Sequence, residues 1–198
     1  MLRASVSLNP AALLLKIFGL LLFPWALSNS APASAADLRP EEIVTVLPKD
    51  AIPAILSPSF DEGRKASWLK GKDLVVGVEI GGDSRAYPFS VLSRKTVVND
   101  TFEGVPLLVV FDEESTTGVI FQRKLEGKTL SFKKAQRSDK KGLLLIDDGS
   151  GSVWEGLTGR AIQGPLKDKK LESIPTTPSF WFGWVDHYPT TELYLTKK

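Results

Sequence analysis

The stretch VPLLVVFDEESTTGVIFQRK, residues 105–124, decides the fold of this 198-residue chain. Apolar runs at residues 105–111 and 119–121 flank a polar segment, residues 112–118, in which the chain must reverse direction. Runs rich in Val, Ile, Leu and Phe that are bounded by turn residues are typical of β-strands. The stretch therefore predicts an antiparallel hairpin, whose acidic tip is either a functional site or a solvated loop.

Short strands and tight turns continue on both sides of this hairpin. The apolar run at residues 74–80 is followed by the turn residues Gly81, Gly82 and Asp83 and by a returning strand at residues 84–87. Further strands are expected at residues 96–100, 129–133, 143–147, 152–155, 160–163 and 192–196. Short helices are expected at residues 62–70, 88–95 and 178–187. The pattern predicts a mostly β domain, all-β or α+β, whose antiparallel hairpins form a barrel or a sandwich with a few short helices.

The first 36 residues have the composition of a secretory signal peptide. Two basic residues lie among the first 16, residues 17–27 form an uncharged apolar run, and a small-residue A-x-A site ends at Ala35. The run is shorter than the roughly 20 apolar residues that a membrane span needs. We expect cleavage after Ala35 or Ala36 and a periplasmic or secreted protein, and the alternative is an uncleaved membrane anchor.

The rest of the chain divides into a lead-in and one domain. Residues 37–59 contain four prolines, and proline fixes φ and discourages helix, so this segment is expected to be extended. Residues 60–198 are expected to form a single β-rich domain. A chain of about this length buries roughly 70% of its unfolded surface and does not need disulfides to fold.

Composition excludes several kinds of chemistry. The chain has no cysteine, so no thiolate nucleophile, disulfide or cysteine zinc site can form. Its one histidine, His187, lies beside Asp186, but no G-x-S-x-G elbow indicates a nucleophile for a catalytic triad. Of 25 Lys+Arg, Arg3 and Lys16 lie in the leader, which leaves 23 against 23 Asp+Glu. The resulting net charge near zero favours no nucleic-acid partner.

Two clusters of carboxylates are candidate ligands for a divalent cation. They are Asp112, Glu113 and Glu114 in the first cluster, and Asp147 and Asp148 in the second. Calcium and magnesium prefer such oxygen ligands, but a site or an acid–base pair requires that the fold bring the clusters together. Three consecutive residues alternate in direction along an extended chain, so they do not all face one ion. We therefore expect residues 112–117 to form a solvated hairpin tip and residues 147–151 a hairpin turn.

Several phrases of the sequence occur together in one known family. They are DAIPAILSP at residues 50–58, VVGVEIGGDSRAYP at residues 75–88, VVNDTFEGVPLLVVF at residues 97–111 and SVWEGLTGRAIQGPL at residues 152–166. The chain resembles the prokaryotic family of exported proteins catalogued as domain of unknown function 3179. The resemblance runs from about residue 50 to the C terminus. It implies that shared positions such as Asn99, Asp100, Trp154 and Gly159 belong to the scaffold, and we expect Trp154 to be buried.

The chain departs from this family at its cysteine and histidine positions. In the family, the strand that matches residues 105–111 usually leads into a Cys-Pro-Leu-Cys-Gly or Cys-Pro-Leu-Thr-Gly loop, and a histidine usually precedes the strand that matches residues 97–100. Here Asp112 and Ser115 stand at the loop positions and Lys95 at the histidine position. A protonated lysine cannot replace an imidazole ligand and aspartate has no thiol chemistry, so any such family site is lost in this chain.

The sequence thus indicates an exported, non-catalytic binding or structural module without a cofactor. Its partner is an unknown protein or small molecule, and a membrane is a partner only if the leader is uncleaved. The alternative function is a carboxylate-based metal-binding protein or hydrolase, in which the two acidic clusters converge.

Overall fold

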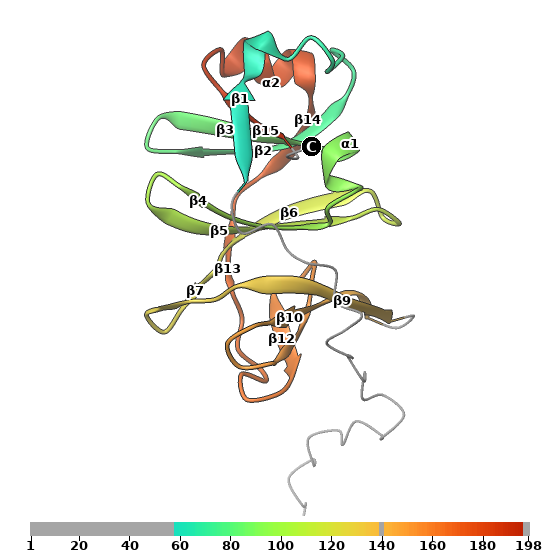
Figure 1. The fold of residues 1–198 in the computed structure, drawn as a ribbon, viewed down its shortest axis with the longest axis vertical. Coiled ribbons are helices and arrows are strands. Elements are labelled where there is room, and N and C mark those ends of the chain that lie inside the picture. Colours follow the sequence, from blue (N-terminus) through green and yellow to red (C-terminus); the bar gives the residue numbers. More distant parts are fainter. Residues whose placement is uncertain (1–57, 139–140, 196–198) are drawn as a thin grey trace, which may run out of the picture. The chain divides into compact units, whose positions relative to one another are not determined.

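The computed structural model describes residues 58–138 and 141–195 of the chain (Figure 1). The predicted leader, residues 1–36, and nearly all of the predicted lead-in, residues 37–59, lie outside the described residues. Strands predominate in the described part, and its helices are short, which confirms the prediction of a mostly β fold. No helix among the described residues is long and apolar enough to cross a membrane.

The described strands form open sheets in sandwich-like layers and do not close into a barrel (Figure 1). The first sheet has the order β1 (Ser59–Glu62), β15 (Glu192–Leu195), β3 (Asp83–Pro88), β2 (Leu74–Ile80) and β14 (Thr177–Phe180). The middle sheet has the order β13 (Glu172–Ile174), β6 (Thr117–Gln122), β5 (Val105–Asp112) and β4 (Val97–Phe102). The third sheet has the order β12 (Arg160–Gln163), β11 (Val153–Glu155), β10 (Gly142–Asp147) and β9 (Phe132–Ser138).

Smaller elements connect these strands. They are the ribbon of β7 (Lys124–Leu125) and β8 (Lys128–Thr129), the 3-10 turn η3 (Gly63–Lys65), and the helices α1 (Phe89–Leu92) and α2 (Trp181–His187). Adjacent strands pair antiparallel, with the exception of β15 and β3, which pair in parallel through Glu192 with Arg85 and Leu193 with Ala86.

The predicted hairpin is β5 and β6, and its apolar runs are continuous because the middle sheet is covered on both faces. Leu107, Val109 and Phe111 of β5 face the first sheet, whereas Leu108 and Val110 face the third sheet. A strand that is exposed on one face alternates apolar with polar residues, whereas a strand that is buried on both faces is apolar at nearly every position. The unbroken apolar run in β5 is therefore explained by the position of this strand between the first and third sheets.

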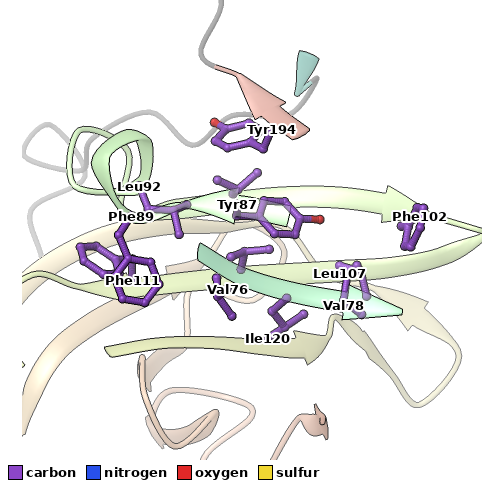
Figure 2. Close-up of a cluster of buried hydrophobic side chains, with 12 residues drawn as sticks. Val76, Val78, Tyr87, Phe89, Leu92, Phe102, Leu107, Phe111, Ile120 and Tyr194 are labelled. Atoms are coloured by element: carbon purple, nitrogen blue, oxygen red, sulfur yellow. The ribbon is translucent and has the colours of Figure 1, made fainter. Parts of the chain in front are cut away.

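The core between the first and middle sheets combines aromatic and aliphatic side chains (Figure 2). Phe89 and Phe111 pack with their ring centroids 4.8 Å apart, and Tyr87 and Tyr194 with centroids 5.6 Å apart. Ile120 of β6 lies among them and is fully buried. Burial of such side chains stabilises a fold by about 1.5–3 kcal/mol each, so this layer contact fixes the register of the hairpin.

The core between the middle and third sheets is centred on Trp154 of β11. This side chain has no exposed surface, which confirms the prediction that it is buried. Its ring meets Phe132 of β9 edge-on, with centroids 5.5 Å apart and an interplanar angle of 84°. Gly159 has a φ of +64°, and a Cβ there would lie 2.7 Å from the ring of Phe121. Both Trp154 and Gly159 thus hold the third sheet against the middle one.

The strands that were not expected from sequence are all at sheet edges. β1, β13 and β14 each occupy an end of their sheet and contain three or four residues. The helix expected at residues 178–187 included most of β14, but these residues form an edge strand, which tolerates Pro178 because one of its sides has no neighbouring strand. The predicted helices are also shorter than expected: residues 62–70 contain only η3, and the last helix begins at Trp181.

Candidate functional site

A pocket of about 300 Å³ lies between the middle and third sheets, beside the tip of the β5–β6 hairpin. Its walls are formed by Thr96, Phe111, Asp112, Glu113, Glu114, Lys134 and Leu143. Residues from the end of β5 and the turn after it, from the position just before β4, and from β9 and β10 therefore meet here. The walls combine carboxylates and one ammonium group with the apolar side chain of Leu143, which is the mixture that orients a small polar ligand.

The family-site positions lie at or beside this pocket. The backbone N–H of Phe111 donates to the carbonyl of Thr96 at 2.9 Å, which holds the start of β4 against the end of β5. Lys95 precedes Thr96 but does not line the pocket, and its backbone N–H donates to Leu92 at 2.9 Å in the turn that follows α1. Asp112 lines the pocket. Ser115 does not line it but forms a hydrogen bond with Asp112.

Asp112 is only 4% exposed, so the expectation that residues 112–117 form a solvated tip is wrong for this residue. Asp112 ends β5 opposite Thr117, and the Ser115 hydroxyl donates to its carboxylate at 2.8 Å. Glu113 and Glu114, in the turn beyond the strand, are exposed as expected. The difference follows from the two-layer burial of β5, because the last residue of the strand still lies between sheets.

The second acidic cluster serves the turn between β10 and β11. Asp147 is buried, and its carboxylate accepts hydrogen bonds from the Ser150 N–H at 2.6 Å, the Ser150 hydroxyl at 2.8 Å and the Trp154 Nε1–H at 2.9 Å. Asp148 forms an ion pair with Lys133 at 2.6 Å. A buried carboxylate that accepts several hydrogen bonds from nearby residues stabilises the local conformation of the chain. Asp147 therefore organises the predicted hairpin turn and fixes Trp154.

The two acidic clusters are not brought together. Asp147 and Asp148 are absent from the walls of the pocket that Asp112 lines. Within residues 58–138 and 141–195, no group of three or more His, Asp or Glu side chains is arranged to hold a metal ion. His187 is exposed at the end of α2 and packs edge-on against Tyr188. The convergence that the metal or hydrolase alternative requires is therefore not found in the described part of the chain.

Asn99 joins the middle sheet to the third. Its side-chain amide accepts a hydrogen bond from the Phe132 N–H at 2.8 Å and donates to the Phe132 carbonyl at 2.9 Å. The amide thereby imitates a strand neighbour for β9, and the buried backbone groups of Phe132 are satisfied. Aspartate or leucine cannot both donate and accept in this way, so the position requires asparagine or glutamine chemistry.

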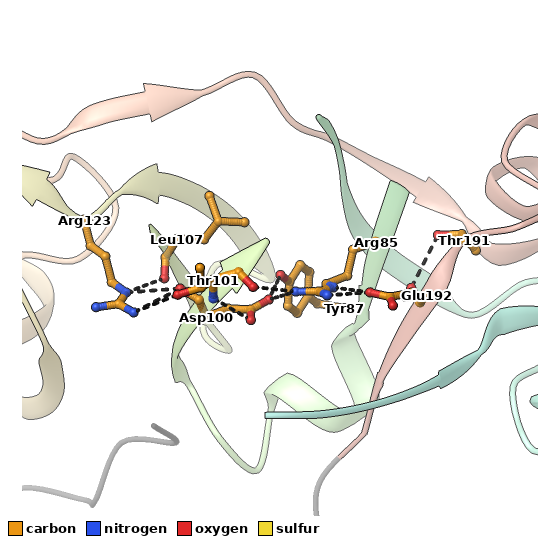
Figure 3. Close-up of polar contacts among 8 residues, drawn as sticks. All are labelled: Arg85, Tyr87, Asp100, Thr101, Leu107, Arg123, Thr191 and Glu192. Carbon is orange, nitrogen blue, oxygen red and sulfur yellow. Dashed lines mark hydrogen bonds and ion pairs between the residues drawn. The ribbon is translucent and has the colours of Figure 1, made fainter. Parts of the chain in front are cut away.

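Asp100 is the centre of a buried polar network between the first and middle sheets (Figure 3). Arg85 Nη1 and the Tyr87 hydroxyl both donate to Asp100 Oδ2 at 2.6 Å. The guanidinium also donates to Glu192, at 2.8 Å from Nε, and lies between the rings of Phe60 and Phe102, at 3.7 and 4.2 Å from their centroids. The charge of Arg85 is thus paired and covered on both faces.

The pKa directions agree with this geometry. Burial, followed by the negative charge of Asp100, raises the pKa of Tyr87 well above its ordinary value. Burial alone would lower the pKa of Arg85, but the hydrogen bond to Glu192 and the charge of Asp100 outweigh it and raise the pKa. At neutral pH the tyrosine is therefore a neutral donor and the arginine a cation. None of these groups is among the residues that line the pocket.

Arg123, just beyond β6, satisfies backbone carbonyls at the opposite end of the hairpin from the acidic tip. Its guanidinium donates to the carbonyls of Asp100 at 3.1 Å, Leu107 at 3.1 Å and Leu130 at 2.8 Å. Burial lowers its pKa. No local pattern in the sequence indicates this role, or the roles of Arg85 and Glu192, because their partners come from other strands.

The pocket also contains two residues that the sequence did not indicate, Thr96 and Lys134. Thr96 follows Lys95 directly, so the family-like position before β4 was the signal that could have found it. Lys134 lies in a run of basic residues on β9, and only its pairing opposite Leu145 places it near the hairpin tip.

Fold and site together define a β-rich, layered domain without cysteine, whose buried polar residues hold the sheets and whose pocket lies at a strand end. A family model described as "Protein of unknown function (DUF3179)" matches residues 49–198, and the chain belongs to this family. The match begins one residue before the stretch at which the resemblance was seen in the sequence. No curated protein and no solved structure shows significant similarity to the chain.

Proposed function

We propose that this protein is an exported, non-catalytic binding module that receives a small polar ligand in the pocket beside the β5–β6 hairpin tip. The observation that carries the proposal is the composition of the pocket walls. Glu113 and Glu114 supply carboxylates, Lys134 supplies an ammonium group, and Leu143 supplies an apolar side chain. These groups meet from two sheets at the position where relatives carry a cysteine loop.

The proposed ligand is a small zwitterion of the amino-acid type. Its ammonium group would meet the carboxylates of the hairpin tip, and its carboxylate would meet Lys134. A volume of about 300 Å³ is at the lower end of the range for small-molecule sites, which favours a ligand of few atoms. The apolar walls give such a ligand a desolvated contact in addition to its charge contacts.

Binding without catalysis is supported by the side chains at the family-site positions. Lys95, Asp112 and Ser115 stand where relatives carry histidine and cysteine or threonine, and the chain contains no cysteine at all. The Ser115 hydroxyl donates to Asp112, and no histidine lies beside it to act as a base. A serine nucleophile requires such a base, so this arrangement supports recognition of a ligand over its conversion.

Export is supported by the leader composition at residues 17–27 and by the A-x-A site that ends at Ala35. The module would then act in the periplasm or outside the cell. N-terminal sequencing of the exported protein should find Ala36 or Asp37 as the first residue. If the first residue is Met1, the segment is an uncleaved membrane anchor and not a signal peptide.

Native mass spectrometry of the protein recovered from its own compartment tests the binding function. We expect the wild-type protein to retain a non-covalent small molecule, and we expect Lys134→Ala and Glu113→Gln to reduce the retained fraction at least tenfold. Glu103→Gln is the matched control, because Glu103 is an exposed acid in the turn at the other end of β5. Absence of any bound molecule, or equal retention in all variants, would contradict the proposal.

A further inference from the structure

Three large aromatic side chains are exposed where the segment after η3 meets the start of α2. Trp68 is 47% exposed, Phe180 50% and Phe182 59%. The rings of Phe180 and Phe182 stack with centroids 6.1 Å apart and an interplanar angle of 13°. Single exposed apolar residues are ordinary, but clustered ones mark a contact surface.

The fold itself keeps these side chains outside the core. The Trp181 N–H donates to the Asp73 carbonyl at 2.8 Å, and the Phe182 N–H donates to the Gly71 carbonyl at 3.0 Å, so the two segments lie side by side. Leu69 and Trp181 point inward and are buried in the same small core. Because these neighbours fill the interior, the aromatic residue next to each of them is left at the surface.

The segment after η3 is also basic. Residues 63–72 contain four cations and no acid: Arg64, Lys65, Lys70 and Lys72. All four are exposed. Lys65 pairs with Glu62 at 2.7 Å, whereas Lys70 and Lys72 form no ion pair with any residue that the structure describes. Asp73 offsets part of the charge, and Lys70 and Lys72 lie two and four residues after Trp68 in the chain.

We propose that this aromatic–basic surface, formed by Trp68, Phe180, Phe182, Lys70 and Lys72, docks onto an anionic membrane. Tryptophan and phenylalanine enter the boundary between headgroups and acyl chains, and adjacent lysines meet anionic headgroups. The aromatic rings supply apolar burial and the lysines supply charge complementarity. Neither the pocket nor its ligand contributes to this contact, so the inference stands apart from the proposed binding function.

A membrane suits this surface better than a protein partner does. Interfaces between proteins are depleted in lysine at their cores, whereas a headgroup layer attracts lysine directly. The export proposed above would also bring the protein to a membrane. A second copy of the chain would place like charges against each other at Lys70 and Lys72, which is unfavourable.

Sedimentation of the exported protein with vesicles tests this inference. Vesicles of phosphatidylcholine with 30% phosphatidylglycerol should bind the wild-type protein, and pure phosphatidylcholine should bind it much more weakly. Each lysine near an anionic surface changes partitioning about fivefold, so the double substitution Lys70→Glu and Lys72→Glu should weaken binding at least about 25-fold. Raising the salt concentration should weaken wild-type binding because the contact is screened.

The matched control reverses two exposed lysines elsewhere, Lys128→Glu in β8 and Lys170→Glu. It has the same net charge as the test variant and should bind within twofold of wild type. Trp68 is the exposed tryptophan of the described part, so contact with brominated lipid should quench emission in wild type and much less in Trp68→Phe. Absence of binding to anionic vesicles, equal loss in the control, or a dimer that Phe182→Ser dissociates would overturn the inference.

Discussion

At the scale of single residues, Asp100 shows how a buried charge is tolerated between two sheets. One of its oxygens accepts from both Arg85 and Tyr87, and its other oxygen accepts from the Thr101 N–H at 2.6 Å. A buried ion pair adds little net stability compared with apolar residues, but removal of one partner is costly because the other is left unpaired. Tyr194 offers the contrast, since its hydroxyl is buried without a hydrogen-bond partner in the described part.

These two tyrosines allow a matched test. Tyr87→Phe should lower the free energy of unfolding by about 1–3 kcal/mol, because Asp100 loses a donor that water cannot replace. Tyr194→Phe removes a buried hydroxyl that has no partner and should leave stability unchanged or raise it slightly. Urea unfolding followed by circular dichroism measures both. Equal destabilisation by the two substitutions would show that the Asp100 network is wrongly described.

The same tyrosine predicts a change of stability at alkaline pH. The folded protein raises the pKa of Tyr87, so its contribution to stability is complete below the ordinary tyrosine value of about 10. Above that pH the unfolded chain releases the proton and the folded protein does not. The advantage of wild type over Tyr87→Phe should therefore shrink by about 1.4 kcal/mol per pH unit above pH 10. A constant difference between pH 8 and pH 11 would contradict this.

Trp154 supplies a second test at this scale. Trp154→Ala should cost about 3–5 kcal/mol, because it leaves a cavity between the middle and third sheets and removes the indole donor to Asp147. Trp68→Ala is the control, since Trp68 is half exposed, and it should change stability by less than about 0.5 kcal/mol. Thermal or urea denaturation is sufficient for both. An unchanged midpoint for Trp154→Ala would show that this residue is peripheral.

At the scale of elements, the β5–β6 hairpin combines two roles in one stretch of sequence. Its apolar strands fill the cores on both sides of the middle sheet, and its tip lines the pocket. The burial of Asp112 results from this double role, because the strand carries its last side chain between the layers. The edge strands β1, β13 and β14 differ from this hairpin. They are short, and each has a neighbouring strand on one side only.

The hairpin tip leads to a prediction about metal ions. Calorimetry of the mature protein with Ca²⁺, Mg²⁺, Mn²⁺ and Zn²⁺ should detect no micromolar binding, because a tight calcium site needs roughly six to eight oxygens and the tip offers few. Asp112→Asn should therefore leave the titrations unchanged, as should the control Glu103→Gln. Micromolar binding that only Asp112→Asn abolishes would favour the metal-binding alternative.

At the scale of the whole molecule, sequence predicts what is encoded locally. Strands such as β2 and β12 begin and end at the expected residues, because their composition and flanking turns are local signals. The layering, the edge strands and the Asp100 network depend on partners far along the chain. Arg85 and Glu192, for example, are 107 residues apart, and no spacing rule links them.

The candidate site was predicted only in part, for the same reason. The acidic tip and the family positions are visible as residue types in sequence. Lys134 and Leu143 join them only after β9 and β10 pack against the middle sheet, and the separation of Asp147 from Asp112 is likewise a tertiary property. The burial of Asp112 could have been anticipated from the unbroken apolar run that precedes it, which indicates a strand covered on both faces.

The most direct test of the central claim is to locate the bound molecule by NMR. The ¹⁵N-labelled protein would be titrated with the small molecule that copurifies with it, and amide shifts would be followed. The account predicts shifts at Thr96, at residues 111–114 and at Lys134, unchanged amides at Phe182, and a ligand that stays chemically intact in the sample. Shifts confined to other parts of the domain, or conversion of the ligand to a product, would contradict it.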